Sequence, residues 1–308
     1  INLPDKSDQI TLINVTSNNT GYGVYATYAN NLQIINCTFN DTSIYGMYIT
    51  YCMNSTITRT RSMYSANYGM YNYRGQNTTI QNSTWSFNTD DGLYIYDSNN
   101  FTIFNCSFED NTNGVYMRFT DNSTVANNSF FKNGGGIRFE TQCHNNTLEN
   151  NTFYEDSYAL YITDNCYWNN ITSNLGINLQ SYGLLLSTTC NENLVLNNTF
   201  MNNQSNNMND GIYIGGGSSN NMILNNTILD PYYYGIRCTG NANTTIKDNM
   251  ISLATSGIYV SSSPGSLVYN NTVVDSETGI TLISQISLNV SSNLFENLSI
   301  HVLFLDSN

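Results

Sequence analysis

The sequence predicts an all-β solenoid, a single parallel β-helix of about twelve coils that spans residues 1–308. Three observations predict it. A motif of Gly, an apolar residue, Tyr and another apolar residue recurs every 22 to 24 residues, with one longer interval of 28. The motif alternates as a strand does, and helix signals are absent. The period is also too short for a propeller blade of about 40 residues, which leaves stacked strands.

The motif begins at twelve positions, which define the coils. Its second and fourth residues, such as Leu93 and Ile95, are apolar and should point inward, whereas Tyr94 between them should point outward. The starting residues are Gly23, Gly46, Gly69, Gly92, Gly114, Gly136, Ala159, Gly183, Gly211, Gly235, Gly257 and Gly279. A further strand at His301–Leu305 and an incomplete coil before Gly23 predict partial coils at both ends, as in a piece of a longer chain.

A second strand follows in each repeat, with an apolar residue, then Asn three residues later and an apolar residue two after that. Because stacked coils place equivalent residues about 4.8 Å apart, this Asn should form an internal ladder and occupy a left-handed bend. The ladder positions are Asn128, Asn151, Asn174, Asn198, Asn226, Asn249, Asn271 and Asn293. The first coils hold Cys37, Thr60, Ser83 and Cys106 there, so the ladder should be incomplete.

The repeat, exemplified by Gly211-Ile-Tyr-Ile and then Asn225-Asn-Thr-Ile, resembles those of NosD-like periplasmic proteins and of archaeal or bacterial cell-surface β-helix proteins. The same repeat class, with its pectin-lyase-like fold, occurs in pectin-active enzymes and alginate epimerases. The resemblance covers essentially the whole chain. It implies a right-handed coil, in agreement with the usual hand of parallel crossovers, but it implies no single function.

Composition narrows the possible partners. The chain has 22 acidic and 9 basic residues, a net charge of −13, and therefore lacks the basic face that nucleic acid or an anionic membrane requires. No run of 18 apolar residues occurs, so membrane insertion is not expected. Few charges together with many Asn, Thr and Tyr favour an extracellular or cell-surface location.

Glycan-acceptor triplets, Asn-x-Ser/Thr, occur at 21 positions and strengthen that expectation. An Asn- and Thr-rich chain also makes such triplets by chance. None lies between four residues before a repeat Gly and seven after it. The sites we single out are Asn54, Asn77, Asn100, Asn122, Asn150, Asn225, Asn243 and Asn270.

The seven Cys residues predict no metal site, because no C-x-x-C occurs and the two His residues lie in distant coils. Cys143, Cys166 and Cys190 share a register in three consecutive coils. Cys166 could form a disulfide with Cys143 or with Cys190, or all three could be buried thiols. No cofactor is expected.

Catalytic candidates are few. Asn88-Thr89-Asp90-Asp91 resembles the Asn-Thr-Asp element of pectin-cleaving hydrolases, yet no second acidic pair, Gly-His-Gly or Arg-x-Lys follows. Arg74 pairs in register with Asp97, and Arg118 with Glu140, with Arg138 nearby. The weak catalytic candidates are therefore Asp90, Asp91, Arg118, Arg138 and Glu140; simple cross-strand charge pairing explains them equally.

Fourteen of the 24 Tyr residues fall in two rows along one face. Exposed contiguous aromatics are typical of an interface, although Tyr stacking could serve the sheet alone. The expected interface residues are Tyr22, Tyr25, Tyr45, Tyr48, Tyr68, Tyr71, Tyr94, Tyr116, Tyr161 and Tyr213.

These features predict a glycosylated structural or adhesive surface protein that self-associates through its ends or its Tyr face into a filament, sheath or surface layer. Enzymatic activity is uncertain and not favoured. The alternatives are a polysaccharide lyase, hydrolase or epimerase that uses the charged cluster, and a carbohydrate-binding rod without turnover.

Overall fold

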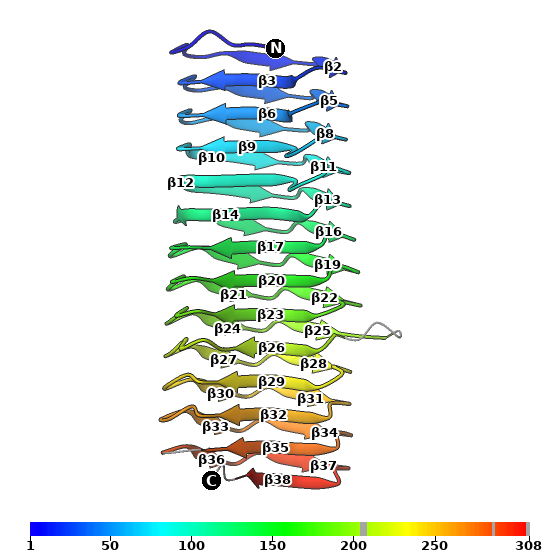
Figure 1. Ribbon diagram of the computed structural model, residues 1–308, viewed down its shortest axis with the longest axis vertical. Helices are drawn as coiled ribbons and strands as arrows, with labels where there is room; N and C mark the ends of the chain where they lie inside the picture. The colour runs from blue at the N-terminus through cyan, green and yellow to red at the C-terminus, as the bar shows by residue number, and fades with distance from the viewer. Residues whose placement is uncertain (204–207, 285–286, 306–308) are drawn as a thin grey trace. The chain divides into compact units, whose positions relative to one another are not determined.

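The computed structural model describes residues 1–203, 208–284 and 287–305, which form strands and turns without any helix. The chain divides into two compact units, Ile1–Thr152 and Phe153–Asn308. Each unit is a stack of coils (Figure 1). A coil consists of a strand that contains or directly follows the repeat Gly position (Gly strand), a second strand and a third strand. That residues 1–308 form a single domain stays a prediction.

In the first unit the coils follow one another from β1 to β18. The Gly strands are β3 (Tyr22–Thr27), β6 (Tyr45–Thr50), β9 (Met70–Tyr73), β12 (Leu93–Phe104), β14 (Asn113–Asp121) and β17 (Gly135–Glu140). The second strands are β1 (Thr11–Ile13), β4 (Gln33–Ile35), β7 (Thr56–Thr58), β10 (Gln76–Gln81), β15 (Thr124–Ala126) and β18 (Thr147–Glu149), and β12 also runs on through this position. The third strands are β2 (Thr16–Asn18), β5 (Thr38–Asn40), β8 (Arg61–Met63), β11 (Thr84–Ser86), β13 (Ser107–Glu109) and β16 (Ser129–Phe131).

The second unit repeats this order, and β19 (Thr152–Tyr154) spans the boundary. Its Gly strands are β20 (Tyr158–Thr163), β23 (Tyr182–Ser187), β26 (Asp210–Ile214), β29 (Tyr234–Thr239), β32 (Ser256–Ser261), β35 (Thr278–Ile283) and β38 (Ile300–Leu305). Its second strands are β21 (Asn170–Thr172), β24 (Leu194–Leu196), β27 (Met222–Leu224), β30 (Thr245–Lys247), β33 (Leu267–Tyr269) and β36 (Asn289–Ser291). Its third strands are β22 (Leu175–Ile177), β25 (Thr199–Met201), β28 (Thr227–Leu229), β31 (Met250–Ser252), β34 (Thr272–Val274) and β37 (Leu294–Glu296).

Within each unit the strands of successive coils pair in parallel and in register. Tyr48 of β6 lies between Tyr25 and Tyr71 of its neighbours, and Ile236 of β29 lies between Ile212 and Ile258. The described residues provide six Gly strands in the first unit and seven in the second, the last being the strand expected at His301–Leu305. The prediction of an all-β parallel β-helix is confirmed.

The alternation of the motif decides what lies inside. Leu93 and Ile95 are fully buried and Tyr94 is only partly exposed. The repeat Gly is needed because a side chain would collide with the next coil. A Cβ on Gly92 would lie 2.7 Å from the carbonyl oxygen of Gly114 and 3.0 Å from the Phe108 ring. Third strands fill the interior with stacked rings, such as Trp85 and Phe108 at a centroid distance of 5.5 Å.

The Asn ladder is confirmed inside each unit. The side chain of Asn128 donates to Oδ1 of Asn151 at 3.0 Å in the first unit, and the backbone N–H of Cys106 donates to Asn128. In the second unit the same bonds, at 2.9–3.0 Å, run through Asn174, Asn198, Asn226, Asn249, Asn271 and Asn293. In the early coils Thr60 and Ser83 accept the corresponding backbone bonds through their hydroxyls.

Our expectation that the ladder Asn itself adopts the left-handed bend was wrong. Positive φ belongs to the preceding residue, which in five coils is also Asn: Asn127, Asn150, Asn197, Asn225 and Asn270. This residue turns the chain and points outward, so that the ladder Asn turns inward. The bend also splits the expected second strand into the second and third strands.

Two shorter ladders were not predicted. Asn88, Asn111 and Asn133 bond at 2.9 and 3.0 Å in the first unit. Asn169, Asn193 and Asn221 bond at 3.0 and 3.1 Å in the second. Each ladder satisfies buried backbone N–H groups at a turn, where a strand partner is missing.

Over the described ranges, no helix is long and apolar enough to cross a membrane. Within the same ranges, no group of three or more His, Cys, Asp or Glu side chains is placed to hold a metal ion.

Candidate binding face

The predicted Tyr rows form a continuous array on the Gly strands of the first unit. Rings of one row stack at centroid distances of 4.9 Å (Tyr25 and Tyr48) and 5.4 Å (Tyr48 and Tyr71), nearly parallel to one another. The second row stacks in the same way, with Tyr45 and Tyr68 at 5.4 Å. We call the outward surface of the Gly strands the Tyr face. Its rings are partly exposed.

The rows also contact each other, so the array is a sheet of rings and not two isolated stacks. Tyr45 lies 5.7 Å from Tyr71, and Tyr68 lies 5.0 Å from Tyr94. Burial against neighbouring rings raises the pKa of Tyr71 to about 12 and also raises that of Tyr68, which lies near Asp91. The hydroxyls of Tyr68 and Tyr71 are therefore neutral hydrogen-bonding groups at physiological pH.

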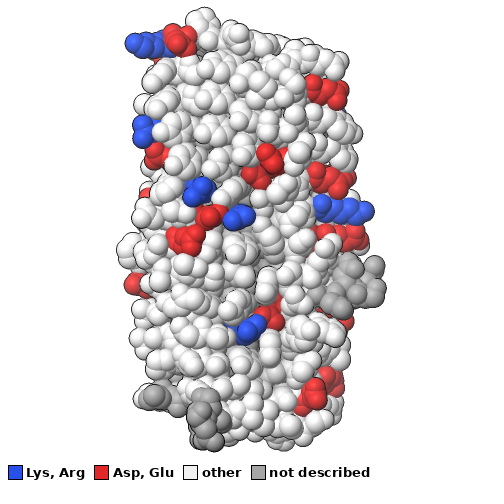
Figure 2. All heavy atoms as spheres, viewed as in Figure 1, with Lys and Arg blue, Asp and Glu red and all other residues white. Residues whose placement is uncertain are grey.

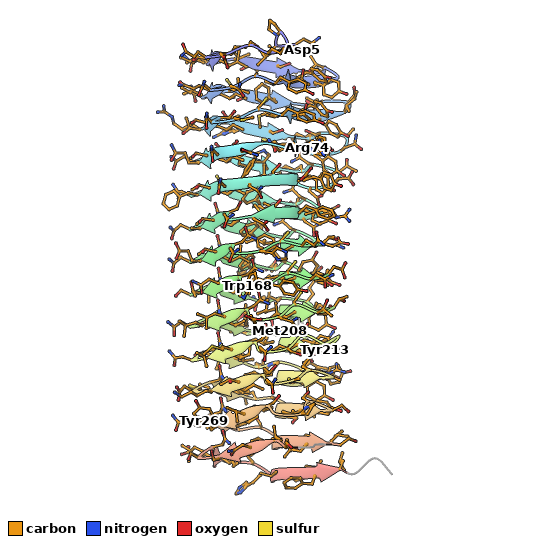
Figure 3. All side chains as sticks on the ribbon, turned by 90° about the vertical axis from the view of Figure 1, so that its left-hand side faces the viewer. Asp5, Arg74, Trp168, Met208, Tyr213 and Tyr269 are labelled. Carbon is orange, nitrogen blue, oxygen red and sulfur yellow. The ribbon has the colours of Figure 1, made fainter. Side chains whose placement is uncertain are left out.

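The second unit carries a sparser version of this face. Tyr161 contacts Tyr158 at 5.2 Å, and Tyr213 stacks with Tyr182 at 6.1 Å. Further along, Tyr234 contacts Tyr259 at 4.8 Å. Figure 3 labels Tyr213 on this surface.

A charged cluster interrupts the Tyr face at β12, β14 and β17. Asp91 is 4% exposed. It directly precedes its repeat Gly, as Tyr68 does one coil earlier, so Asp91 takes the place of a Tyr in the second row. Its Oδ1 accepts bonds from the backbone and side chain of Asn113, at 3.1 and 2.7 Å. Burial raises the pKa of Asp91 to about 6, and the nearby charges of Asp90 and Arg138 act in opposite directions on it.

Arg138 and Glu140 form the rest of the cluster. Arg138 Nη2 lies 2.9 Å from Glu140 Oε2, and its guanidinium lies 4.9 Å from the centre of the Tyr116 ring. The Tyr116 hydroxyl donates to the same carboxylate. Arg118 is in register with Glu140, as expected, and contacts the rings of Tyr96 and Phe119 at 6.0 and 5.9 Å. Figure 2 shows basic and acidic side chains side by side on a largely uncharged surface.

The structure thus brings Asp91, Arg138 and Glu140 close together, with Arg118 beside them and Asp90 at the preceding turn. The arrangement is poorly suited to proton transfer. Asp91 has a suitable pKa but is almost inaccessible, and the Glu140 carboxylate is engaged by Arg138 and Tyr116. The pKa of Tyr116 is raised by burial and by Glu140, which keeps its hydroxyl protonated and makes it a weak acid. The cluster can donate and accept hydrogen bonds to a ligand.

A similar cluster in the second unit was missed. Asp210, 3% exposed in its side chain, lies 3.7 Å from Arg237, and burial raises its pKa to about 6. Arg237 lies over three rings, Tyr213, Tyr234 and Tyr259, at 4.8 to 5.9 Å. The signal was present in the sequence. Asp210 precedes its repeat Gly as Asp91 does, and Arg237 has the motif position of Arg138.

The predicted Arg74–Asp97 pair forms as well, with Nε 2.6 Å from Oδ2, but both side chains are about half exposed. A pair in that setting contributes little to stability. It lies at the end of β9, beside the Tyr73 ring at 5.0 Å.

All eight predicted glycan acceptors are exposed, and all eight have φ between 52° and 59°. This gives the triplet a structural reason. In all eight triplets the Asn takes the left-handed bend and the middle residue faces inward. In six of them the Ser or Thr begins the next strand, whereas the triplets of Asn77 and Asn100 lie within β10 and β12. Whether any of them carries a glycan stays a prediction.

The Cys residues are all buried. In the second unit, Cys190 lies beside Cys166, whose thiol together with burial raises the pKa of Cys190 far above its usual range. Stacking of these two residues therefore agrees with the predicted register, while the disulfide stays a prediction.

Comparisons with known proteins agree with this geometry. The family model for the right-handed β-helix region matches residues 4–84, 61–200 and 201–308. No curated protein matches the sequence. Among solved structures, PfbA, a surface adhesin of Streptococcus pneumoniae, superposes with a TM-score of 0.67 at 14% identity, covering 92% of this chain and 85% of the other.

Two polysaccharide-active proteins are similar as well. A PL6 alginate lyase, solved with a trisaccharide, has a TM-score of 0.65 at 15% identity over 95% of this chain and 83% of its own. The periplasmic alginate epimerase AlgG has a TM-score of 0.55 at 16% identity over 94% and 79%. At these identities the likeness concerns the fold alone.

Proposed function

Because the chain belongs to the right-handed β-helix family, whose fold serves both adhesion and catalysis, we propose from its surface that it is an adhesive protein of the cell surface that binds polysaccharide through the Tyr face. The observation that carries this proposal is the continuous array of partly exposed, neutral Tyr rings in the first unit. Such rings offer flat apolar area for the C–H faces of sugars, and their hydroxyls bond sugar hydroxyls.

The charged groups favour a polysaccharide, and not a second copy of the chain, as the ligand of the Tyr face. Arg118, Arg138 and Arg237, three of only nine basic residues, lie on the Tyr face beside carboxylates. Planar guanidinium donors and carboxylate acceptors suit a polymer of hydroxyl groups, whereas a dry self-association surface would be depleted in carboxylates. The surface adhesin among the similar structures fits a location outside the cell.

Binding to soluble polysaccharides tests the proposal. We would measure binding of alginate, polygalacturonate, xylan and mixed-linkage β-glucan to the protein and to a Tyr48→Ala/Tyr71→Ala variant. The variant should lose at least about tenfold in affinity, the equivalent of about 1.4 kcal/mol. A matched control is Tyr64→Ala, because Tyr64 is 52% exposed and directly follows the third strand β8, away from the Tyr face. Equal binding by all three proteins, or none, would contradict the proposal.

Self-association through the Tyr face, with the filament, sheath or layer that it predicts, is the second candidate. The same ring array supports it, because large aromatic surfaces are common in protein interfaces. Sedimentation velocity over a range of concentrations distinguishes the two. Oligomers that dissociate in the Tyr48→Ala/Tyr71→Ala variant would favour self-association.

A polysaccharide-active enzyme is the third candidate; one property of the Asp91–Arg138 cluster supports it, although Asp91 is only 4% exposed. The pKa of Asp91, about 6, would suit an acid or base. Release of reducing or unsaturated ends from any of the four polymers, lost in Asp91→Asn but retained in Asp97→Asn, would establish this function.

A further inference from the structure

A second surface, away from the Tyr face, has the composition of a small ligand site. It lies in the second unit at the turns that precede β21, β24 and β27. Trp168 is 54% exposed there, in the position that is Asn in several other coils. Figure 3 labels Trp168 among the side chains of this unit. Only one other Trp exists in the chain, Trp85, and it is completely buried.

The indole is held in place. Its Nε1–H donates to Glu192 Oε2 at 2.7 Å, from the equivalent turn one coil later. The ring meets Tyr167 edge-on at a centroid distance of 6.0 Å. Aromatic residues at other turns, such as Tyr28 and Tyr51, instead stack face to face at 4.6 Å and so cover one another. Trp168 is therefore oriented while more than half of its surface remains open to solvent.

A shallow hollow adjoins the indole and contains both apolar and polar groups. Leu194 and Met222 are opposite one another on β24 and β27, and Met222 is 46% exposed. Glu192 and the exposed Asn220 supply polar groups at its edge. A carboxylate can accept about four hydrogen bonds, so the bond from Trp168 leaves capacity for hydroxyl donors.

These groups identify the ligand by its chemistry. An open indole and two apolar side chains suit the C–H face of a pyranose ring, and a carboxylate and an amide suit its hydroxyls. None of the residues that line the hollow is basic, and Glu192 would repel a uronate carboxylate. We propose that Trp168 and Glu192 form a binding site for a neutral oligosaccharide, independent of the Tyr face.

The test uses the natural fluorescence of Trp168. Cellohexaose, mannohexaose, laminarihexaose and maltohexaose would each be titrated into the intact protein. At least one should shift the emission of Trp168 to shorter wavelength and protect it from acrylamide, because a sugar displaces water from the indole. The buried Trp85 serves as the internal reference, since its emission should not change.

Variants separate the site from other effects. Trp168→Ala should lower the affinity, measured by calorimetry, by at least about tenfold, and Trp168→Phe should lower it less because a ring is retained. Glu192→Gln should weaken binding several-fold, and Tyr48→Ala/Tyr71→Ala should leave it unchanged. Circular dichroism would confirm that each variant is folded.

Three results would overturn the proposal: no spectral change with any of the four sugars up to millimolar concentration, unchanged affinity of Trp168→Ala, or loss of binding in the Tyr48→Ala/Tyr71→Ala variant. Dimers that dissociate in Trp168→Ala, without any sugar binding, would assign the hollow to self-association instead. Failure of the Tyr face to bind polysaccharide would leave this site unaffected, so the two proposals fail separately.

Discussion

Asp91 Oδ1 accepts a hydrogen bond of 2.7 Å from the side chain of Asn113, one coil further along the first unit. Asn113 occupies the motif position of Asp91 itself, so a carboxylate stands where an amide would form the same contact. The carboxylate has to lose most of its hydration in this position. An amide at residue 91 would keep the hydrogen-bond acceptor without a buried charge.

We therefore predict that Asp91→Asn stabilises the protein above pH 6. The folded-state pKa of about 6 exceeds the ordinary pKa of an Asp carboxyl, 3.8, so the folded state holds its proton more tightly than the unfolded state. Stability from this group is present below about pH 4 and is lost as pH rises towards 6. The full loss is on the order of 3 kcal/mol. Thermal unfolding of the protein and the variant at pH 4 and pH 7.5 measures it.

The difference between variant and parent should be large at pH 7.5 and small at pH 4. Asp97→Asn is the control, because Asp97 is about half exposed and pairs with Arg74. It should change stability little at either pH. A melting temperature of Asp91→Asn at pH 7.5 equal to or below that of the parent would contradict the prediction.

The coil could be predicted from the sequence because the residues that must be buried recur at the spacing of the coils. Three features recur with one common period: the repeat Gly, the inward residues one and three positions after it, and the ladder Asn. Each of them has a single structural reason. The split of the second strand was missed, since an Asn-Asn pair such as Asn225 and Asn226 does not reveal which Asn bends the chain. The structure assigns the bend to Asn225.

The candidate sites were only partly predictable. In-register charges identified Arg74 with Asp97 and placed Arg118 beside Glu140, but they did not show that Glu140 forms an ion pair with Arg138, two residues away on the same strand. A side chain on the face of a strand can contact a residue of the same strand as well as a residue of the neighbouring strand. The register between strands does not predict which of the two contacts forms. Trp168 was not predicted as a site residue, because a single aromatic residue at a turn is not part of any periodic pattern.

The Asn-Asn pairs allow a matched test of the ladder. Asn226→Ala should destabilise the protein by about 2–4 kcal/mol, because Asn226 donates to Asn249 and accepts from Asn198, both at 3.0 Å, and is fully surrounded. Asn225→Gly should cost within about 0.5 kcal/mol, since Gly adopts the left-handed bend and the side chain is exposed. Thermal unfolding of protein made without glycosylation would compare them. Equal effects would disprove the assignment.

The thiols of the second unit allow a prediction about redox state. We predict a disulfide between Cys166 and Cys190 in protein isolated from its natural source, because the two thiols lie beside each other in adjacent coils. Peptide mapping without reduction should recover the linked pair. Should both be reduced, they should react slowly with iodoacetamide in the folded state, since the raised pKa of Cys190 disfavours the thiolate. Rapid alkylation of Cys190 would contradict the buried arrangement.

We predict that the stacked glycan acceptors are not all used at once. Asn54, Asn77 and Asn100 lie at one turn of three successive coils, and their side chains bond to one another at 3.0 and 3.1 Å. Coils are about 4.8 Å apart, less than the width of a branched glycan. If the protein is glycosylated, occupancy of Asn77 should therefore exclude occupancy of Asn54 and Asn100 in the same molecule. Mass spectrometry of peptides that contain two of these sites measures the joint occupancy.

Replacing the central site sharpens that test. Asn77→Asp removes the acceptor and keeps a short polar side chain that tolerates the left-handed bend, so occupancy of Asn54 and Asn100 should rise in the variant. Asn225→Asp is the control, because Asn225 lies at the bend between β27 and β28, a different turn of the coil from that of Asn77. Peptides doubly modified at Asn77 and Asn100 would show that the glycans diverge enough to share the turn. The spacing of the coils would then place no limit on how densely this surface is covered.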